Sequence, residues 1–213
     1  MIKNKKILAV IPARGGSKGI PRKNIKLIAG KPLLTWSVLA AKESKYLDAV
    51  VVSTDDAEIK KVALKAGSEV LDRPKKYATD KATTISVLQH AIEKLQGYDA
   101  IVLLQPTSPL RTGKLIDQAI ERFFKKKADT LATGYICKDY EWGSTNNIPR
   151  QKLKGWFYDD GNIYVQSINH IKKGQWTGKK LEPMIIDKHY NFEIDDETDF
   201  HIVEQLMKKY LLS

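Results

Sequence analysis

A segment rich in glycine and cationic side chains occupies residues 13–24, ARGGSKGIPRKN, directly after a short apolar run. Its glycines, Gly16 among them, let the backbone turn tightly and bring N–H groups close to an anion. Its cations are Arg14, Lys18, Arg22 and Lys23. The spacing matches neither the Walker loop nor the GxGxxG dinucleotide fingerprint. The segment therefore predicts a polyphosphate-binding loop of another kind, and the plain alternative is a basic surface turn.

Two further polar segments carry side chains that suit an anionic, hydroxylated ligand. In DRPKKYATDKATT at 72–84, Arg73 and Lys81 could reach phosphate, and Thr84 could contact a sugar or a base. The plain alternative for this segment is a capped polar loop. In LLQPTSPLRTG at 103–113, two prolines fix the backbone of a loop rich in hydrogen-bonding groups. The residues that this loop presents for a hydroxylated, carboxylated ligand are Gln105, Thr107, Ser108 and Arg111.

Short apolar runs alternate with helical patterns around these loops. We expect strands at 6–12, 48–53, 68–71, 100–104 and 130–136, and helices at 32–42, 57–67, 85–96 and 115–127. Continuous apolar strands that alternate with helices predict an α/β fold of three layers, Rossmann-like, with a mostly parallel sheet and helices on both faces. Such sheets bind ligands beyond the carboxyl ends of their strands, which is where the polar loops fall. The STDD segment at 53–56 also falls at such an end, and we interpret it as a helix cap.

The pattern lapses into polar, turn-rich sequence after about residue 137. We expect a short excursion over 137–160, which is a candidate dimerisation element, within a single domain spanning 1–213. Two more strands, GNIYVQ and PMIID, and a capped amphipathic helix at the end of the chain follow the excursion.

The composition of the 213 residues narrows the class of protein. The chain carries a formal net charge of +11, which favours anionic partners. Its lysines are scattered over every segment, however, so we expect no nucleic-acid partner. No apolar run approaches the roughly 20 residues that span a bilayer, and we expect no membrane partner. The lone Cys137 excludes an intramolecular disulfide, which favours a reducing, cytoplasmic location.

The ordered motifs resemble the acylneuraminate cytidylyltransferases, the CMP-sialic acid synthetases. The shared segments include IPARGGSKGIPRKNI, VVSTDD, LLQPTSPLRT, PRQKL, DGNIYV and EIDDETDF, and they run from about Lys6 to Phe200. The resemblance implies a nucleotidyltransferase fold, a role in cell-surface glycan biosynthesis, and a homodimer. It also implies that CTP reacts with a nine-carbon 2-keto sugar acid, giving a CMP-sugar and pyrophosphate, with Mg²⁺ required and Mn²⁺ as the alternative metal.

The resemblance implies roles for individual residues. The residues expected to bind the nucleotide come from the glycine-rich segment at 13–24 and from the segment at 72–84. They are Arg14, Gly16, Ser17, Lys18, Lys23, Asn24, Arg73 and Thr84. Gln105 is expected to contact the sugar acid, and Arg150 to close over the sugar site, often from the second subunit of a dimer. Among the nucleotide-binding residues, we expect Arg14, Lys18 and Lys23 to act in catalysis by holding the β- and γ-phosphates and the departing pyrophosphate.

The motif that resembles the family's metal site reads EIDDETDF, so Glu193 and Asp195 take the places of the two expected aspartates. Residues two apart on an extended backbone point to one face. Mg²⁺ prefers oxygen ligands and binds through one or two carboxylates plus substrate phosphates. We therefore assign metal binding to both residues and a catalytic role to Asp195. The plain alternative for this acidic run is a helix cap, which Asp196 or Thr198 could supply anyway.

Three hypotheses about function stay open. The first is a CTP:nonulosonate cytidylyltransferase with N-acetylneuraminate as the acceptor. The second keeps the chemistry but uses legionaminate, because the central excursion is short and DDGNIYV stands where many relatives have NGAIYI. Pseudaminate and 2-keto-3-deoxy-manno-octonate (KDO) rank lower, because their enzymes lack a good match to LLQPTSPLR. The third is a basic nucleotide- or nucleic-acid-binding module, which predicts basic and aromatic residues clustered on one face.

Overall fold

A seven-stranded sheet runs through the molecule in the order β5-β4-β1-β6-β8-β7-β9. The computed structural model describes residues 2, 4–140, 143 and 148–212. The strands are β1 (Ile7–Pro12), β4 (Ala49–Thr54), β5 (Glu69–Asp72), β6 (Ala100–Leu104), β7 (Thr130–Cys137), β8 (Trp156–Ser167) and β9 (Leu181–Ile185). Neighbouring strands pair in parallel except around β8, which is antiparallel to both β6 and β7. The sheet is therefore mostly parallel, as predicted.

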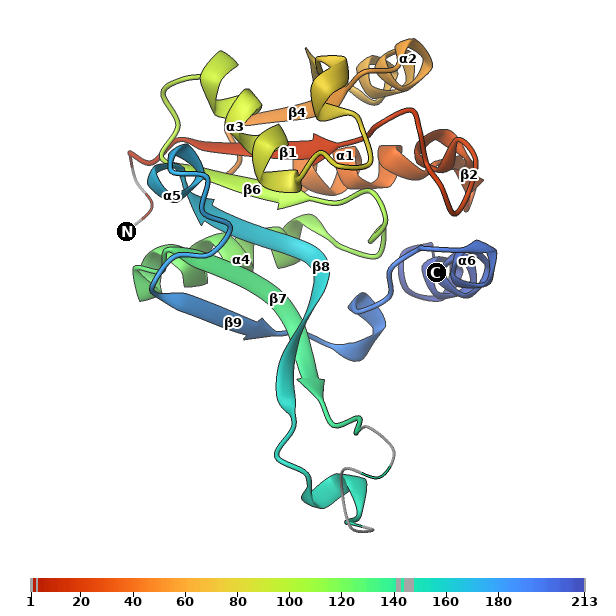
Figure 1. Cartoon of the computed structure of the whole chain (residues 1–213). Coiled ribbons are helices and arrows are strands. Elements are labelled where there is room, and N and C mark those ends of the chain that lie inside the picture. The colour runs from red at the N-terminus through yellow and green to blue at the C-terminus, as the bar shows by residue number, and fades with distance from the viewer. Residues whose placement is uncertain (1, 3, 141–142, 144–147, 213) are drawn as a thin grey trace.

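Helices cover both faces of this sheet (Figure 1). The α-helices of the described residues are α1 (Leu33–Glu43), α2 (Ala57–Ala66), α3 (Thr84–Lys94), α4 (Gly113–Lys126), α5 (Ile168–Lys172) and α6 (Glu197–Tyr210), of which α6 lies apart from the two faces. Alternate residues of β1 point to opposite faces. Ile7, Ala9 and Ile11 pack with residues of α1, α2 and α4, whereas Leu8 and Val10 pack with α3 and α5. The three-layer α/β prediction is confirmed.

Helix α6 packs away from the main sheet, against the small hairpin of β2 (Leu27–Ile28) and β3 (Lys31–Pro32). Ile28, Phe200, Val203 and Met207 form the buried contact. Figure 1 shows α6 beside the end of the sheet toward which the β1 and β6 arrows point. The chain that enters α6 therefore passes the carboxyl ends of the parallel strands.

Strands β7 and β8 form a ribbon that extends beyond the rest of the sheet (Figure 1). Their pairing continues to Cys137↔Trp156, with an irregularity between Ala132 and Gly134. Strand β8 thus begins at Trp156, five residues before the strand that we expected from GNIYVQ. Part of the expected excursion, 141–142 and 144–147, lies outside the described residues. Among the described residues, no helix is long and apolar enough to cross a membrane.

Candidate active site

A cavity of about 420 Å³ opens beyond the carboxyl ends of β1 and β6. Its walls come from three polar loops, after β1, β5 and β6, and from the segment that leads into α6. The cavity brings together most of the residues that we predicted for the site: Arg14, Ser17, Lys18, Lys23, Asn24, Arg73, Thr84, Gln105, Thr107 and Asp195. The strand ends of an α/β sheet are where ligands bind in this architecture.

The glycine-rich loop after β1 is held in shape by neighbouring side chains. The Gly15 N–H donates to Asp55 Oδ1 at 3.0 Å, and Asn24 Nδ2 donates to the Arg14 carbonyl at 2.9 Å. A Cβ at Gly19 would collide with the Asp195 carbonyl, so this loop and the acidic segment approach each other closely only because residue 19 is glycine. Gly16, by contrast, faces open space and does not line the cavity.

Arg22 lies in the same loop but serves the structure rather than the cavity. Its guanidinium donates to Asp56 and Glu58 at the start of α2. Asp56 also accepts from the Glu58 and Ile59 N–H groups, so the predicted helix cap in STDD is confirmed. The ion pair with Arg22 lowers the pKa of Asp56 to about 2.

Three cations of the loop reach the cavity. Arg14 and Lys18 both contact Asp80, at 2.8 Å and 3.0 Å. Lys23 Nζ donates to the Ile194 carbonyl at 2.7 Å and so lies beside the acidic segment. Asp80 lines the cavity as well, and sequence analysis missed it because an isolated aspartate in a polar loop gives no signal of its own.

Arg73 supplies a fourth cation from the end of β5. It is buried, and its guanidinium donates to the Ser53 hydroxyl and carbonyl. Burial lowers the pKa of Arg73 to about 10, with the nearby Asp55 charge opposing and Arg14 adding to this shift. Arg73 therefore stays protonated at neutral pH and holds a fixed positive charge at the cavity wall.

Asp195 lines the cavity and Glu193 does not, but the charge of Asp195 lies close enough to act on Glu193. Burial, together with the charges of Asp195, Asp160 and Asp159, raises the pKa of Glu193 to about 7, while the Arg111 charge opposes this shift. A Cβ at Gly161, whose φ is +66°, would collide with the Glu193 carboxylate. The glycine of the DDG sequence therefore makes room for Glu193.

This acidic pair suits a hard cation. Glu193 and Asp195 provide carboxylate oxygens, and buried Asp160 Oδ2 has no hydrogen-bond partner. Among the described residues, no group of three or more His, Cys, Asp or Glu side chains is arranged to hold a metal alone. Mg²⁺ binds through one or two carboxylates and completes its shell with water and substrate phosphates.

Some of the site residues that we predicted in the loop after β6 line the cavity, and others are buried in the interior. Gln105 and Thr107 line the cavity, and the Thr107 carbonyl accepts from the Ile194 N–H at 2.9 Å. Ser108 is fully buried and its hydroxyl has no hydrogen-bond partner. The structure therefore places Ser108 behind the cavity wall rather than in contact with a ligand.

Arg111 also lies behind this wall, so the direct sugar contact that we expected needs correction. Arg111 is 2% exposed and donates to the side chains of Asn162 and Ser37 and to the Gln105 carbonyl. Burial lowers its pKa, while the charges of Asp160 and Glu193 oppose the shift. The guanidinium instead positions Gln105 and offsets the buried acidic charge. The spacing alone could not show whether this arginine faces outward or inward.

Arg150 lies away from the cavity within its own chain. It sits beyond the ribbon of β7 and β8, where its guanidinium pairs with Asp139 at 2.7 Å. It lines a separate cavity of about 510 Å³ together with Tyr135, Lys138 and Phe192. One chain therefore does not bring Arg150 next to Gln105.

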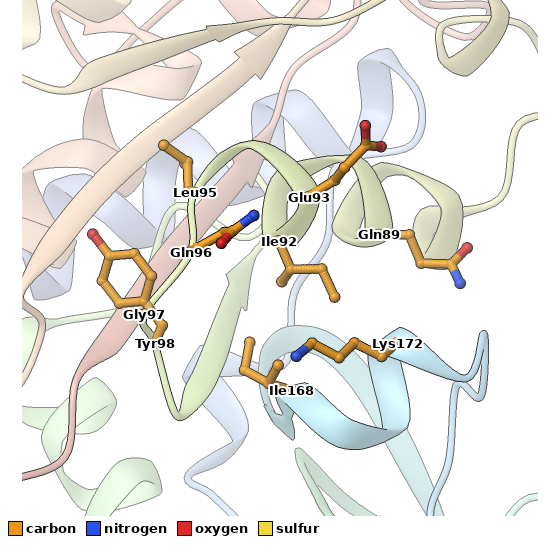
Figure 2. Close-up of a pocket in the computed structure, with 9 residues that line it drawn as sticks. All are labelled: Gln89, Ile92, Glu93, Leu95, Gln96, Gly97, Tyr98, Ile168 and Lys172. Carbon is orange, nitrogen blue, oxygen red and sulfur yellow. The ribbon is translucent and has the colours of Figure 1, made fainter.

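Figure 2 shows another cavity, of about 460 Å³, between α3 and α5. Gly97 and Tyr98 in its wall directly precede β6, so it lies at the amino ends of the parallel strands. Its charged lining residues are Glu93 and Lys172. This composition gives no arginine fork for phosphate and no pair of carboxylates for a metal.

The chain matches the family model described as "Cytidylyltransferase" over residues 8–161. It is 44% identical over 174 residues to a pseudaminic acid cytidylyltransferase from Campylobacter jejuni, covering 78% of this chain and 70% of that protein. It is 30% identical to a CMP-N,N'-diacetyllegionaminic acid synthase from Legionella pneumophila, covering 95% and 97% of the two chains.

An N-acylneuraminate cytidylyltransferase from Escherichia coli is 29% identical over 96% of this chain, and the chain spans about half (52%) of that relative's length. Among solved structures, CMP:2-keto-3-deoxy-manno-octonic acid synthetase in complex with CTP has a TM-score of 0.80, with 15% sequence identity and coverage of 97% and 100% of the two chains. At that identity the likeness concerns the fold.

Proposed function

Because the chain belongs to the cytidylyltransferase family, we propose that it transfers CMP from CTP to a nine-carbon 2-keto sugar acid, a nonulosonate, with release of pyrophosphate. The observation that carries this proposal is the cavity in which Arg14, Lys18 and Lys23 face a wall that contains Asp195. A cluster of fixed cations beside a carboxylate suits a nucleoside triphosphate that arrives with a divalent cation.

The residues of the cavity suggest how the reactants are held. Arg14, Lys18 and Lys23 bind the β- and γ-phosphates and then the departing pyrophosphate. Their positive charges stabilise the negative charge that develops on the pyrophosphate in the transition state. Ser17, Asn24, Arg73 and Thr84 complete the nucleotide site. The anomeric hydroxyl of the sugar attacks the α-phosphorus in line, so most of the catalysis comes from positioning and charge neutralisation.

The acceptor lies toward the loop after β6 in this proposal. Gln105 and Thr107 hydrogen-bond the sugar acid from the cavity wall, and Arg111 holds the Gln105 carbonyl from behind. Glu193 and Asp195 hold Mg²⁺, or alternatively Mn²⁺. When bound, such an ion neutralises charge on the transferring phosphate.

Three chemically similar sugar acids are candidates for the acceptor. N-acetylneuraminate and legionaminate stand as the acceptors expected from the motifs. Pseudaminate, which ranked lower on its motif match, becomes a serious candidate, because 44% identity to the Campylobacter jejuni enzyme exceeds the identities to the other two relatives. The cations of the cavity give no support to the nucleic-acid-binding alternative, because Arg14, Lys18 and Lys23 line one cavity together with Asp80 and Asp195.

We include a homodimer and a cytoplasmic location in the proposal. The ribbon of β7 and β8 carries exposed apolar side chains at Ile136, Trp156 and Tyr158, which suit burial against a second chain. A dimer would also explain why Arg150 lies far from the cavity of its own chain, since the partner's cavity could receive it. The lone Cys137 supports the reducing compartment.

The catalytic carboxylate gives the sharpest test of this proposal. We expect Asp195→Ala to abolish CTP-dependent pyrophosphate release while the protein stays folded, because this side chain is exposed and its backbone N–H, which donates to Asp199, is retained. ATP, GTP and UTP serve as nucleotide controls, and Asp187→Ala as a variant of an aspartate outside the cavity. Near-normal release by Asp195→Ala would refute the assignment.

A further inference from the structure

Asp80 joins two cations of the proposed phosphate site. It lies between β5 and α3, 66 residues after Arg14, and reaches across the cavity to the glycine-rich loop. Its Oδ1 accepts from Arg14 Nη1 at 2.8 Å, and its Oδ2 lies 3.0 Å from Lys18 Nζ. One carboxylate therefore bridges the two side chains that a phosphate would need.

The arrangement of atoms resembles that of a bound phosphoryl group. Two oxygens on one centre each contact a different cation, as two oxygens of a phosphate would. Lys18 and Arg14, in that order of effect, lower the pKa of Asp80, so the group is an anion at neutral pH. If Asp80 stayed in place beside a triphosphate, two anions would compete for the same cations.

We propose that Asp80 is a positioning residue that occupies the phosphate subsite of the nucleotide-free protein and yields Arg14 and Lys18 to the entering polyphosphate. The inference rests on the proposed function, since it assumes that the cavity binds the phosphates of a nucleotide. It adds that Asp80 competes with these phosphates for Arg14 and Lys18.

The exposure of the three groups makes this exchange easy. The side chains of Arg14, Lys18 and Asp80 are 32%, 74% and 52% exposed. Exposed ion pairs stabilise a fold only weakly, so a polyphosphate of higher charge can break them at small cost. Asp80 thus keeps both cations extended over the cavity without binding them tightly.

The exchange would also assist product release. Once the CMP-sugar has formed, pyrophosphate still contacts Arg14 and Lys18, and the Asp80 carboxylate, which pairs with both in the free protein, can replace it. Removing the Asp80 charge should therefore strengthen the binding of pyrophosphate, in contrast to removing a residue that helps to build the site.

Calorimetric titration with pyrophosphate in EDTA, without metal or nucleotide, tests this inference. The proteins are the full chain and the variants Asp80→Asn, Asp80→Glu and Asp72→Asn. Asp72 is the matched control, because it pairs with Lys60 at 2.7 Å and does not line the cavity. A thermal melt of each variant establishes that it is folded.

We expect Asp80→Asn to bind pyrophosphate about 3- to 5-fold more tightly than the unchanged protein, which is the effect of an exposed ion pair of up to about 1 kcal/mol. Asp80→Glu should return toward the unchanged affinity, and Asp72→Asn should match it. Binding by Asp80→Asn that is no tighter than that of Asp72→Asn would overturn the inference. A separate titration of the unchanged protein with CTP and Mg²⁺ distinguishes the two proposals. Failure to bind CTP there would overturn the proposed function, whereas failure to bind pyrophosphate alone would overturn the inference about Asp80.

Discussion

At the scale of single residues, the shape of each cation matters as much as its charge. Arg14 presents a planar fork at the cavity wall, while Lys18 and Lys23 present point charges. A lysine at position 14 keeps the charge and loses the fork. The proposed site therefore predicts that the two residue types are not interchangeable there.

Arg14→Lys should lower kcat/KM for CTP by about tenfold or more, since the loss of a bidentate contact with a polyphosphate is worth at least roughly 1.4 kcal/mol. Steady-state kinetics measures the effect. Arg122→Lys is the control, because Arg122 pairs with Glu182 on the surface and does not line the cavity. Activity of Arg14→Lys within a factor of two of the unchanged protein would place Arg14 outside the reaction.

The direction in which a loop side chain faces is the feature of single residues that the sequence does not reveal. Side-chain types and spacing, together with the family resemblance, identified many of the residues that line the cavity, because loops that follow parallel strands meet at one edge of a sheet. The sequence could not tell that Arg111 faces inward while Gln105, in the same loop, lines the cavity. That difference depends on Ser37 and Asn162, which come from distant elements and receive the Arg111 hydrogen bonds.

At the scale of elements, the N-terminus of α2 holds the loop that carries the cations proposed to bind phosphate. Asp56 caps α2 and pairs with Arg22 of that loop. Its pKa is lowered to about 2 from an ordinary value of 3.8, so the unfolded chain binds more protons than the folded chain between these values. The stability contributed by Asp56 is therefore complete above about pH 4 and is lost as the pH falls toward 2.

Asp56→Asn keeps a capping side chain and removes only the charge. We expect it to lower the free energy of unfolding by roughly 0.5–1 kcal/mol at pH 6, a value kept small because Arg22 is 40% exposed. The difference from the unchanged protein should shrink between pH 4 and pH 2. Urea unfolding at several pH values measures it, and a constant difference across that range would contradict the assigned ion pair.

The ribbon of β7 and β8 shows which elements sequence patterns miss. Buried strands such as β6 are continuous apolar runs and were predicted to the residue. The first half of β8, WFYDD, lies in a two-stranded extension, where Trp156, Tyr158 and Asp159 are exposed instead of packed between two helical layers. Its apolar run, WFY, is too short to indicate a buried strand, and the pattern indicated the start of β8 five residues late.

At the scale of the whole molecule, this ribbon is the surface proposed to meet a second chain. Trp156 is 53% exposed on it. We expect Trp156→Glu to convert a dimer into a single chain of 24.1 kDa, because burying an unpaired carboxylate in an apolar contact is costly. Leu64→Glu on α2 is the control, since Leu64 is similarly exposed, at 55%, away from the ribbon.

Light scattering after gel filtration distinguishes the outcomes of these two substitutions. A mass of one chain for Trp156→Glu and two chains for both Leu64→Glu and the unchanged protein would support the interface. An unchanged protein that already has the mass of one chain would contradict the proposed dimer.

The central claim is that the cavity joins CMP to a nonulosonate. Its most direct test is mass spectrometry of the products formed from CTP and Mg²⁺ with N-acetylneuraminate, legionaminate, pseudaminate or KDO in separate reactions. We predict one CMP-sugar together with an equal amount of pyrophosphate, formed from one of the first three acceptors. The absence of any CMP-sugar, from folded protein and with all four acceptors, would contradict the claim.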